Sequence, residues 1–273
     1  MKWFRRIAIG LVGVFALAYG LALGGMYVFQ RDFQYDRSGR LFELSETKLA
    51  NAELVEIPTT GGARLAGRYQ APAPGRPLIH YFRGNAQSFS REHERYGAMV
   101  ADGYGFLAFD YRGFPGSPGE INEQNILDDG LAAYDWAAAK GFPIVLWGRS
   151  LGSGPSTWVA KNREADALLL ETPFDSAVAV AHDRYGFLPV DWLMLDQFHV
   201  DDWIADVAEP VMVAHGTADT TIGVKHGERV YALAPNKDEL WIEPGAGHGD
   251  MWASGIWERA KAFFGRAEAK PVL

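Results

Sequence analysis

The chain has 273 residues, of which 48% are hydrophobic and 22% charged, and this balance is typical of a globular protein. Its formal net charge of −8 argues against nucleic acid as a partner, because a phosphate backbone is bound by a basic surface. The absence of cysteine excludes disulfides, thiolate metal sites and a cysteine nucleophile.

The N-terminal segment predicts a membrane anchor. Residues 7–29 carry no charge, and as a helix they would reach about 34 Å, enough to cross a hydrocarbon core of about 30 Å. Lys2, Arg5 and Arg6 precede this run, which favours a cytoplasmic N-terminus and a large domain on the other side of the membrane. We therefore predict a single transmembrane anchor over residues 1–32 and one domain over residues 33–273.

A cleaved signal peptide is the alternative interpretation of this segment. Residues 16–18 read Ala-Leu-Ala, which resembles a signal-peptidase site with small residues. The hydrophobic region of a signal peptide has only about 7–15 residues, whereas here the apolar run continues well past that site. The length of the run therefore favours an anchor that remains attached.

In the rest of the chain, strand-like and helix-like segments alternate, which is typical of a mostly parallel sheet with crossover helices. We expect strands at 54–58, 64–70, 78–82, 106–111, 143–147, 167–171, 211–215 and 239–243. We expect helices at 87–101, 125–140, 153–163 and about 250–264. The first two strands read as a leading hairpin, because Gly61-Gly62 lies near the turn between them.

The pentapeptide Gly148-Arg149-Ser150-Leu151-Gly152 carries the strongest functional signal. It follows the strand expected at 143–147 and precedes the helix expected at 153–163, which is the context of a G-x-S-x-G nucleophile elbow. A serine hydroxyl is a poor nucleophile at neutral pH and needs a neighbouring base, which in turn needs a third group to orient it. A nucleophilic Ser150 therefore requires an imidazole and a carboxylate elsewhere in the chain.

Asp219 comes directly after the strand at 211–215, and His248 lies in a loop of small residues after the strand at 239–243. The carboxyl ends of parallel strands meet at one edge of a sheet, so both side chains are expected near Ser150. We predict that Ser150 is the nucleophile, His248 the base and Asp219 the carboxylate that orients His248.

An acyl-transfer site also needs two backbone N–H donors for the developing oxyanion. Leu151, the residue after the nucleophile, supplies the first. The loop after the strand at 78–82 reads Arg83-Gly84-Asn85, and we predict that the N–H of Asn85 supplies the second. An ordinary turn is the alternative for this loop, because Gly-Asn is a good turn pair.

The six other histidines are interpreted from their surroundings in the sequence, and His182 and His199 lie in a segment expected to form a cap, where they could touch substrate. His80 and His215 lie within strand-like apolar runs and are expected to be packed in the interior. His93 and His226 lie on polar, helix-like stretches and are expected to be solvated. No H-E-x-x-H, calcium loop or strand-linked G-x-G-x-x-G occurs, so the sequence implies no metal and no cofactor.

Residues 174–205 separate two expected core strands by more than a plain crossover needs, and they are predicted to form a small cap over Ser150. The segment is rich in aromatic residues, among them Phe187 and Trp192. One interpretation is an apolar slot for an acyl chain, with these two side chains as substrate-binding residues. The other is that the cap needs these aromatics for its own small core.

Three segments together resemble the α/β-hydrolase superfamily: 148–152, His215-Gly-Thr-Ala-Asp219 and Gly245-Ala-Gly-His248. More narrowly, the chain is similar to membrane-anchored, single-span members grouped with serine aminopeptidase-like and depalmitoylase-like proteins. This resemblance implies the α/β-hydrolase fold, with helices on both faces of the sheet. In that family the oxyanion loop usually reads His-Gly-Asn, and here Arg83 replaces the histidine. An exposed Arg83 would be a ligand for an anionic substrate group.

The leading hypothesis for function is a serine hydrolase that cleaves carboxylic esters or thioesters of acylated or lipid-like substrates through an acyl-enzyme. An amidase or aminopeptidase with the same three residues is the first alternative, because ester and amide cleavage use the same triad. A non-catalytic binding protein with the same fold is the second. The presence of all three triad candidates argues against a non-catalytic protein.

Overall fold

The computed structural model describes residues 1–49 and 51–268. Its centre is an eight-stranded sheet in the order β1-β2-β4-β3-β5-β6-β7-β8. The strands from β4 to β8 along this order run parallel, and β1 and β2 join antiparallel at one edge. The fold is therefore the mostly parallel sheet that the alternating segments predict.

The strands agree closely with the segments expected from the sequence. Their bounds are β1 Glu53–Pro58, β2 Arg64–Gln70, β3 Leu78–Phe82, β4 Gly105–Phe109, β5 Ile144–Arg149, β6 Ala167–Glu171, β7 Val211–Gly216 and β8 Lys237–Glu243. The central strands β3 to β7 are buried along nearly their whole length. A strand covered by helices on both faces has no polar side to present, which is why these segments read as continuous apolar runs.

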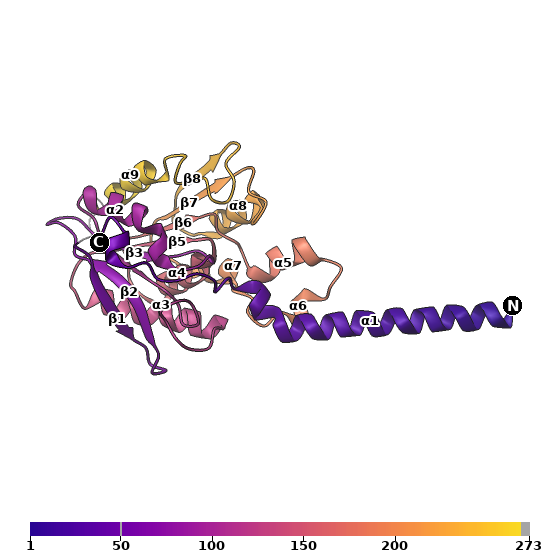
Figure 1. Cartoon of the computed structure of the whole chain (residues 1–273). Coiled ribbons are helices and arrows are strands. Elements are labelled where there is room, and N and C mark those ends of the chain that lie inside the picture. Colours follow the sequence, from indigo (N-terminus) through magenta and orange to yellow (C-terminus); the bar gives the residue numbers. More distant parts are fainter. Residues whose placement is uncertain (50, 269–273) are drawn as a thin grey trace.

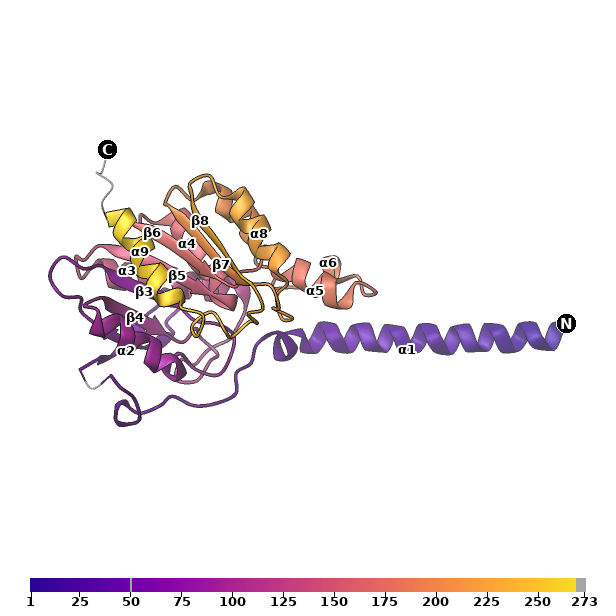
Figure 2. The ribbon, with the colours of Figure 1, turned by 90° about the horizontal axis from the view of Figure 1, so that it is seen from above.

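Helices pack on both faces of the sheet (Figures 1 and 2). The core on one face is formed with α3 (Glu123–Ala138), α4 (Ser153–Asn162) and α8 (Val224–Leu233). The core on the opposite face is formed with α2 (His93–Ala101) and α9 (Ile256–Glu268). Two separate hydrophobic cores thus hold the sheet between them, and the carboxyl ends of its strands remain available for a site.

The first helix, α1, comprises Lys2–Gln34 and extends away from the domain (Figure 1). It is long and apolar enough to span a membrane, and none of its residues is buried. Its C-terminal turns lie beside the segment between β6 and β7, which carries α5 (Ala177–Tyr185) and α6 (Val190–Leu193). Helix α7 (Val200–Trp203) then returns the chain to the sheet before β7.

Candidate active site

Ser150 sits in a strained turn between β5 and α4. Its φ of 51° lies in the left-handed region, which non-glycine residues seldom adopt. The glycines on either side allow this turn, because there is no room for a side chain at either position. A Cβ at Gly148 would lie 2.0 Å from Ser156 Oγ, and one at Gly152 would lie 2.0 Å from the carbonyl oxygen of Phe82. The tight backbone holds the hydroxyl of Ser150 at the carboxyl end of β5.

The three residues predicted from the sequence as a triad lie in hydrogen-bond contact. His248 Nε2 is 2.9 Å from Ser150 Oγ, and His248 Nδ1 is 2.7 Å from Asp219 Oδ2. The ring is thus held by its Nδ1 while its Nε2 faces the serine. This is the arrangement in which an imidazole can accept the hydroxyl proton while the carboxylate stabilises the imidazolium that forms.

Asp219 is surrounded by donors. Its Oδ1 accepts the backbone N–H groups of Thr221 (2.8 Å) and Ile222 (2.9 Å), and the ring of His215 approaches Oδ2 to 3.2 Å. Burial acts to raise the pKa of Asp219, but the hydrogen bonds from His215 and His248 outweigh it and hold that pKa well below its usual range. The carboxyl is therefore an anion at every pH at which the protein would work.

His215 was expected only to be packed, and its contact with Asp219 was not predicted. The ring is fully buried, and its Nε2 is 2.9 Å from the carbonyl oxygen of Ile222 as well as close to Asp219. A carbonyl oxygen can only accept, so this nitrogen carries the proton. His215 thus acts as a fixed donor that positions Asp219. The i, i+4 spacing within His215-Gly-Thr-Ala-Asp219 is the only signal of this role in the sequence.

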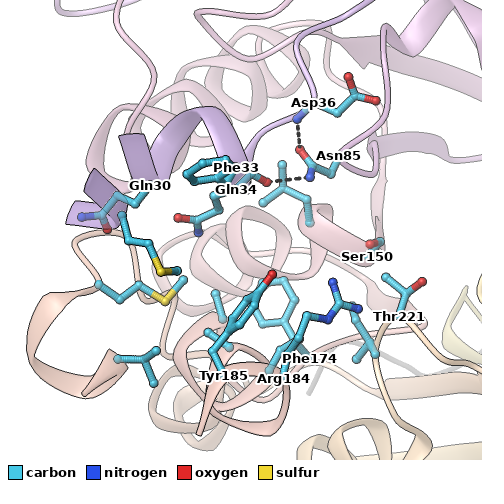
Figure 3. A pocket seen from close by; sticks show the side chains of 18 of the residues that line it. Gln30, Phe33, Gln34, Asp36, Asn85, Ser150, Phe174, Arg184, Tyr185 and Thr221 are labelled. Carbon is cyan, nitrogen blue, oxygen red and sulfur yellow. Dashed lines mark hydrogen bonds between the residues drawn. The ribbon is translucent and has the colours of Figure 1, made fainter. Parts of the chain in front are cut away.

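The loop that carries Asn85 is attached to the chain just after α1. The Nδ2 of Asn85 donates to the carbonyl of Gln34 (2.7 Å), and its Oδ1 accepts the N–H of Asp36 (3.1 Å), as Figure 3 shows. Asp36 also forms an isolated β-bridge with Ala86. The side chain of Asn85 therefore fixes the position of the loop, and its backbone N–H remains the group predicted to bind an oxyanion.

Ser150 opens into a pocket of about 510 Å³. Both predicted oxyanion donors, Asn85 and Leu151, line it together with His248. Most of the remaining lining is apolar. It comes from the last turns of α1 and from residues 177–196, the α5–α6 segment (Figure 3). A pocket of this size is suited to a small ligand with a long apolar part, because its lining is mainly apolar and its polar side chains, such as Gln30 and Arg184, are few beside the apolar ones.

Arg83 does not line this pocket, and the expectation of an exposed guanidinium is wrong. Its side chain is 1% exposed, forms an ion pair with the buried Asp110 and lies over the ring of Phe114 at 4.1 Å. It also donates to the carbonyls of Gly84 and Gln87. The buried carboxylate of Asp110 holds the guanidinium inside the protein, so Arg83 supports the loop from behind and cannot meet a substrate anion in the pocket.

Phe187 and Trp192 are also absent from the residues that line the pocket. Their exposed fractions are 74% and 88%, so neither the acyl slot nor a core of the cap accounts for them. The lining from the predicted cap instead comes from two other aromatic residues, Phe174 and Tyr185, and from smaller side chains such as Leu188. The structure does not place these two side chains in the pocket, and sequence alone does not give the direction of a side chain in an irregular segment.

Some clusters of titratable residues lie outside the pocket. His226 was expected to be solvated, but it is buried, with Nδ1 2.7 Å from Asp175 and Nε2 3.0 Å from Asp183. Burial acts to lower the pKa of His226, and the two carboxylates raise it overall. Among the described residues, His199, Asp201 and Asp202 could converge on a metal ion. Partly exposed acidic groups of this kind are common in proteins that bind no metal ion.

A scan against models of protein families found no match. The chain is 31% identical over 256 residues to the uncharacterized protein Rv2307c of Mycobacterium tuberculosis, covering 92% of this chain and 91% of that one. It is also 31% identical over 186 residues to the lysophosphatidylserine lipase ABHD12 of Danio rerio, covering 60% of this chain and 49% of the relative. The chain thus spans about half of the length of that lipase.

The fold has close structural counterparts. The esterase Pf2001 of Pyrococcus furiosus superposes with a TM-score of 0.66 at 19% identity, over 84% of this chain and 96% of that one. A mostly parallel sheet with a serine on a strained turn after strand β5 is typical of the α/β-hydrolase fold. Together with the relatives, these features show that the chain belongs to the α/β-hydrolase superfamily.

Proposed function

We propose that the protein is a membrane-anchored serine hydrolase that cleaves carboxylic esters or thioesters of acylated, lipid-like molecules. The observation that carries this proposal is the chain of contacts from Asp219 through His248 to Ser150 at the end of a mainly apolar pocket. The name of the lysophosphatidylserine lipase ABHD12 supports a lipid ester as substrate, and the structural neighbour Pf2001 is an esterase.

In the proposed reaction, Ser150 Oγ attacks the carbonyl carbon of the ester while its proton passes to His248 Nε2. The N–H groups of Asn85 and Leu151 bind the negative oxygen of the tetrahedral intermediate. His248 then donates its proton to the departing alcohol or thiol, which leaves an acyl group on Ser150. Water, deprotonated by His248, attacks this acyl-enzyme and releases the carboxylic acid, and the proton returns to Ser150.

The same proposal includes the arrangement of the chain. Residues 1–32 would anchor it, residues 33–273 would form the hydrolase domain with a cap at about 174–205, and the domain would lie on the non-cytoplasmic side. Lys2, Arg5 and Arg6 before the apolar run support this orientation. Because the chain has no cysteine, a single Leu54→Cys variant tests it in spheroplasts. Labelling by an impermeant maleimide is expected before lysis, and labelling only after lysis would reverse the orientation.

A panel of acyl esters, acyl thioesters and aminoacyl amides on the purified full chain tests the function. We expect kcat/KM to rise with acyl length, because each additional methylene buried in the pocket adds about 0.8 kcal/mol of binding. Ser150→Ala should abolish this turnover. Ser153→Ala is the matched control, since Ser153 is buried three residues later and its hydroxyl has no hydrogen-bond partner among the described residues. Faster cleavage of amides than of esters would favour the aminopeptidase alternative, and no turnover on the whole panel would favour the non-catalytic one.

A further inference from the structure

The pocket beside Ser150 is closed on one side by the membrane helix. Leu23, Met26 and Phe33 of α1 line it, opposite side chains of the α5–α6 segment. Leu23 and Met26 pack against a small apolar cluster of that segment, formed by Val178, Leu188 and Val190. Helix α1 is therefore part of the pocket as well as a connection to a membrane, and Figure 3 shows Gln30 and Phe33 of α1 across the pocket from Tyr185.

Polar contacts fix α1 to the same segment. Gln30 donates to the carbonyl of Leu193 (3.1 Å) and accepts the N–H of Leu195 (2.8 Å). Arg31 holds Asp196 with two hydrogen bonds, at 2.9 and 3.2 Å. Farther along the helix, the hydroxyl of Tyr19 donates to the carbonyl of Phe187 (3.2 Å). The α5–α6 segment consequently lies alongside α1 from residue 19 to residue 31.

One boundary of the expected membrane span falls within this stretch of α1. A hydrocarbon core of about 30 Å takes about 20 helical residues, so a span that begins at Ile7 ends near Met26. Phe187 and Trp192, which are highly exposed, are carried by the segment bonded to α1 at Tyr19, inside this span, and at Gln30, just beyond its end. Large exposed apolar side chains mark contact surfaces, and tryptophan is enriched at the boundary between lipid and water.

We propose that the pocket opens to the bilayer, and that a lipid with one acyl chain passes laterally between α1 and the α5–α6 segment to reach Ser150. Phe187 and Trp192 hold this opening in the lipid–water interface. This inference rests on the proposed function, because it takes the lipid to be the substrate that Ser150 cleaves. A lateral path keeps the acyl chain in apolar surroundings, whereas a path through water would expose every methylene. Continuity of the pocket with α1 is what favours lipid as the occupant over a protein partner.

The position of the opening can be tested without any turnover. The cysteine-free chain allows Trp192→Cys to be labelled with an environment-sensitive fluorophore in phosphatidylcholine vesicles that contain a spin-labelled lipid. Leu54→Cys is the control, because Leu54 is also highly exposed but lies on β1, at the far edge of the sheet. We expect the spin label to quench the fluorophore at residue 192 at least twofold more than at residue 54. Equal quenching at the two sites would overturn the proposal.

The path itself is tested with two substrates that share a leaving group. In the double variant Phe187→Asp/Trp192→Asp, hydrolysis of p-nitrophenyl oleate embedded in vesicles should fall at least fivefold, while hydrolysis of dissolved p-nitrophenyl acetate stays within twofold. Leu54→Asp should change neither rate. Equal effects on the two esters, or no effect on either, would contradict lateral entry. If the unmodified protein cleaves neither ester, the proposed function fails, and the quenching measurement still decides where the opening lies.

Discussion

His80 is a neutral histidine enclosed in the centre of the sheet. Its ring is completely buried between aromatic side chains, 4.2 Å from Phe82 and 5.6 Å from Phe109 between ring centroids. Neither ring nitrogen has a hydrogen-bond partner among the residues that the structure describes. Burial lowers the pKa of His80 to about 3, because a charged imidazole would lose its hydration without gaining a counter-ion.

This histidine predicts a loss of stability in mild acid. The unfolded chain binds a proton near pH 6.5 and the folded chain does so only near pH 3, so the contribution of His80 is complete above pH 6.5 and is lost as the pH falls from there toward 3. Between pH 7.5 and 5.5 the loss amounts to about 1.4 kcal/mol. His80→Leu should remove this part of the pH dependence of the unfolding free energy. Denaturant unfolding at both pH values measures it, and an unchanged difference would contradict the assignment.

Arg83 illustrates how a buried charge escapes prediction from sequence. Its partner Asp110 lies at the end of the next strand in the sheet, 27 residues away in the chain. Two charges taken out of water are tolerated only when they are paired and hydrogen-bonded, and this pair receives a further N–H from Phe89. Nothing in the sequence around Arg83-Gly84-Asn85 indicates this pairing. Arg83, which stands where the family usually has a histidine, was therefore expected to be exposed.

At the scale of elements, the end of α1 connects the anchor to the loop of Asn85. The carbonyl of Gln34 and the N–H of Asp36 bind both ends of the Asn85 amide. Asp196, which is buried, depends on Arg31 and on the hydroxyl of Tyr35. The contacts of Asn85 join residues 49 and 51 positions apart, and those of Asp196 join residues 161 and 165 positions apart. Separations of this size are why the sequence indicated the long apolar helix but not its contribution to the site.

Two truncations separate the anchor's two roles. Deletion of residues 2–22 keeps the pocket-lining turns of α1, and deletion of residues 2–34 removes them. In detergent, we expect kcat/KM for p-nitrophenyl acetate to be at least tenfold lower for the longer deletion, because Asn85 loses the carbonyl of Gln34 and Asp196 loses the guanidinium of Arg31. Thermal unfolding of both proteins controls for loss of the fold. Equal activity of two folded truncations would show that α1 only anchors the chain.

Elements with strong local signals were predictable, and those defined by distant contacts were less so. Strand β3 has the bounds expected from its apolar run, Leu78–Phe82. All five of its residues are buried, because helices cover both faces of the sheet, and the strand is therefore visible in the sequence as one continuous run. The closing helix begins at Ile256 rather than near 250, because the preceding residues form turns after the loop of His248. Helix α8 was recognised in the sequence only as a polar, helix-like stretch around His226 and was given no bounds, since only Val230 among its apolar side chains is fully buried.

For the whole molecule, the order of the sheet explains why the candidate site could be read from the sequence. Ser150, Asp219 and His248 follow β5, β7 and β8, whose carboxyl ends lie at the same edge of the sheet. Strand alternation and the G-x-S-x-G turn were enough to bring them together. The pocket was not predictable in the same way, because it forms between the long apolar helix α1 and an irregular segment whose packing no periodicity describes.

The central claim, that Ser150 is the nucleophile of a hydrolase, is tested most directly by a covalent adduct. The purified full chain would be treated with a fluorophosphonate, weighed intact by mass spectrometry and digested to locate the modified residue. We predict one adduct per chain, on Ser150, absent from Ser150→Ala, retained in Ser153→Ala and formed much more slowly in His248→Ala because the hydroxyl proton then has no acceptor. An adduct on another residue, or an undiminished adduct in Ser150→Ala, would contradict the account.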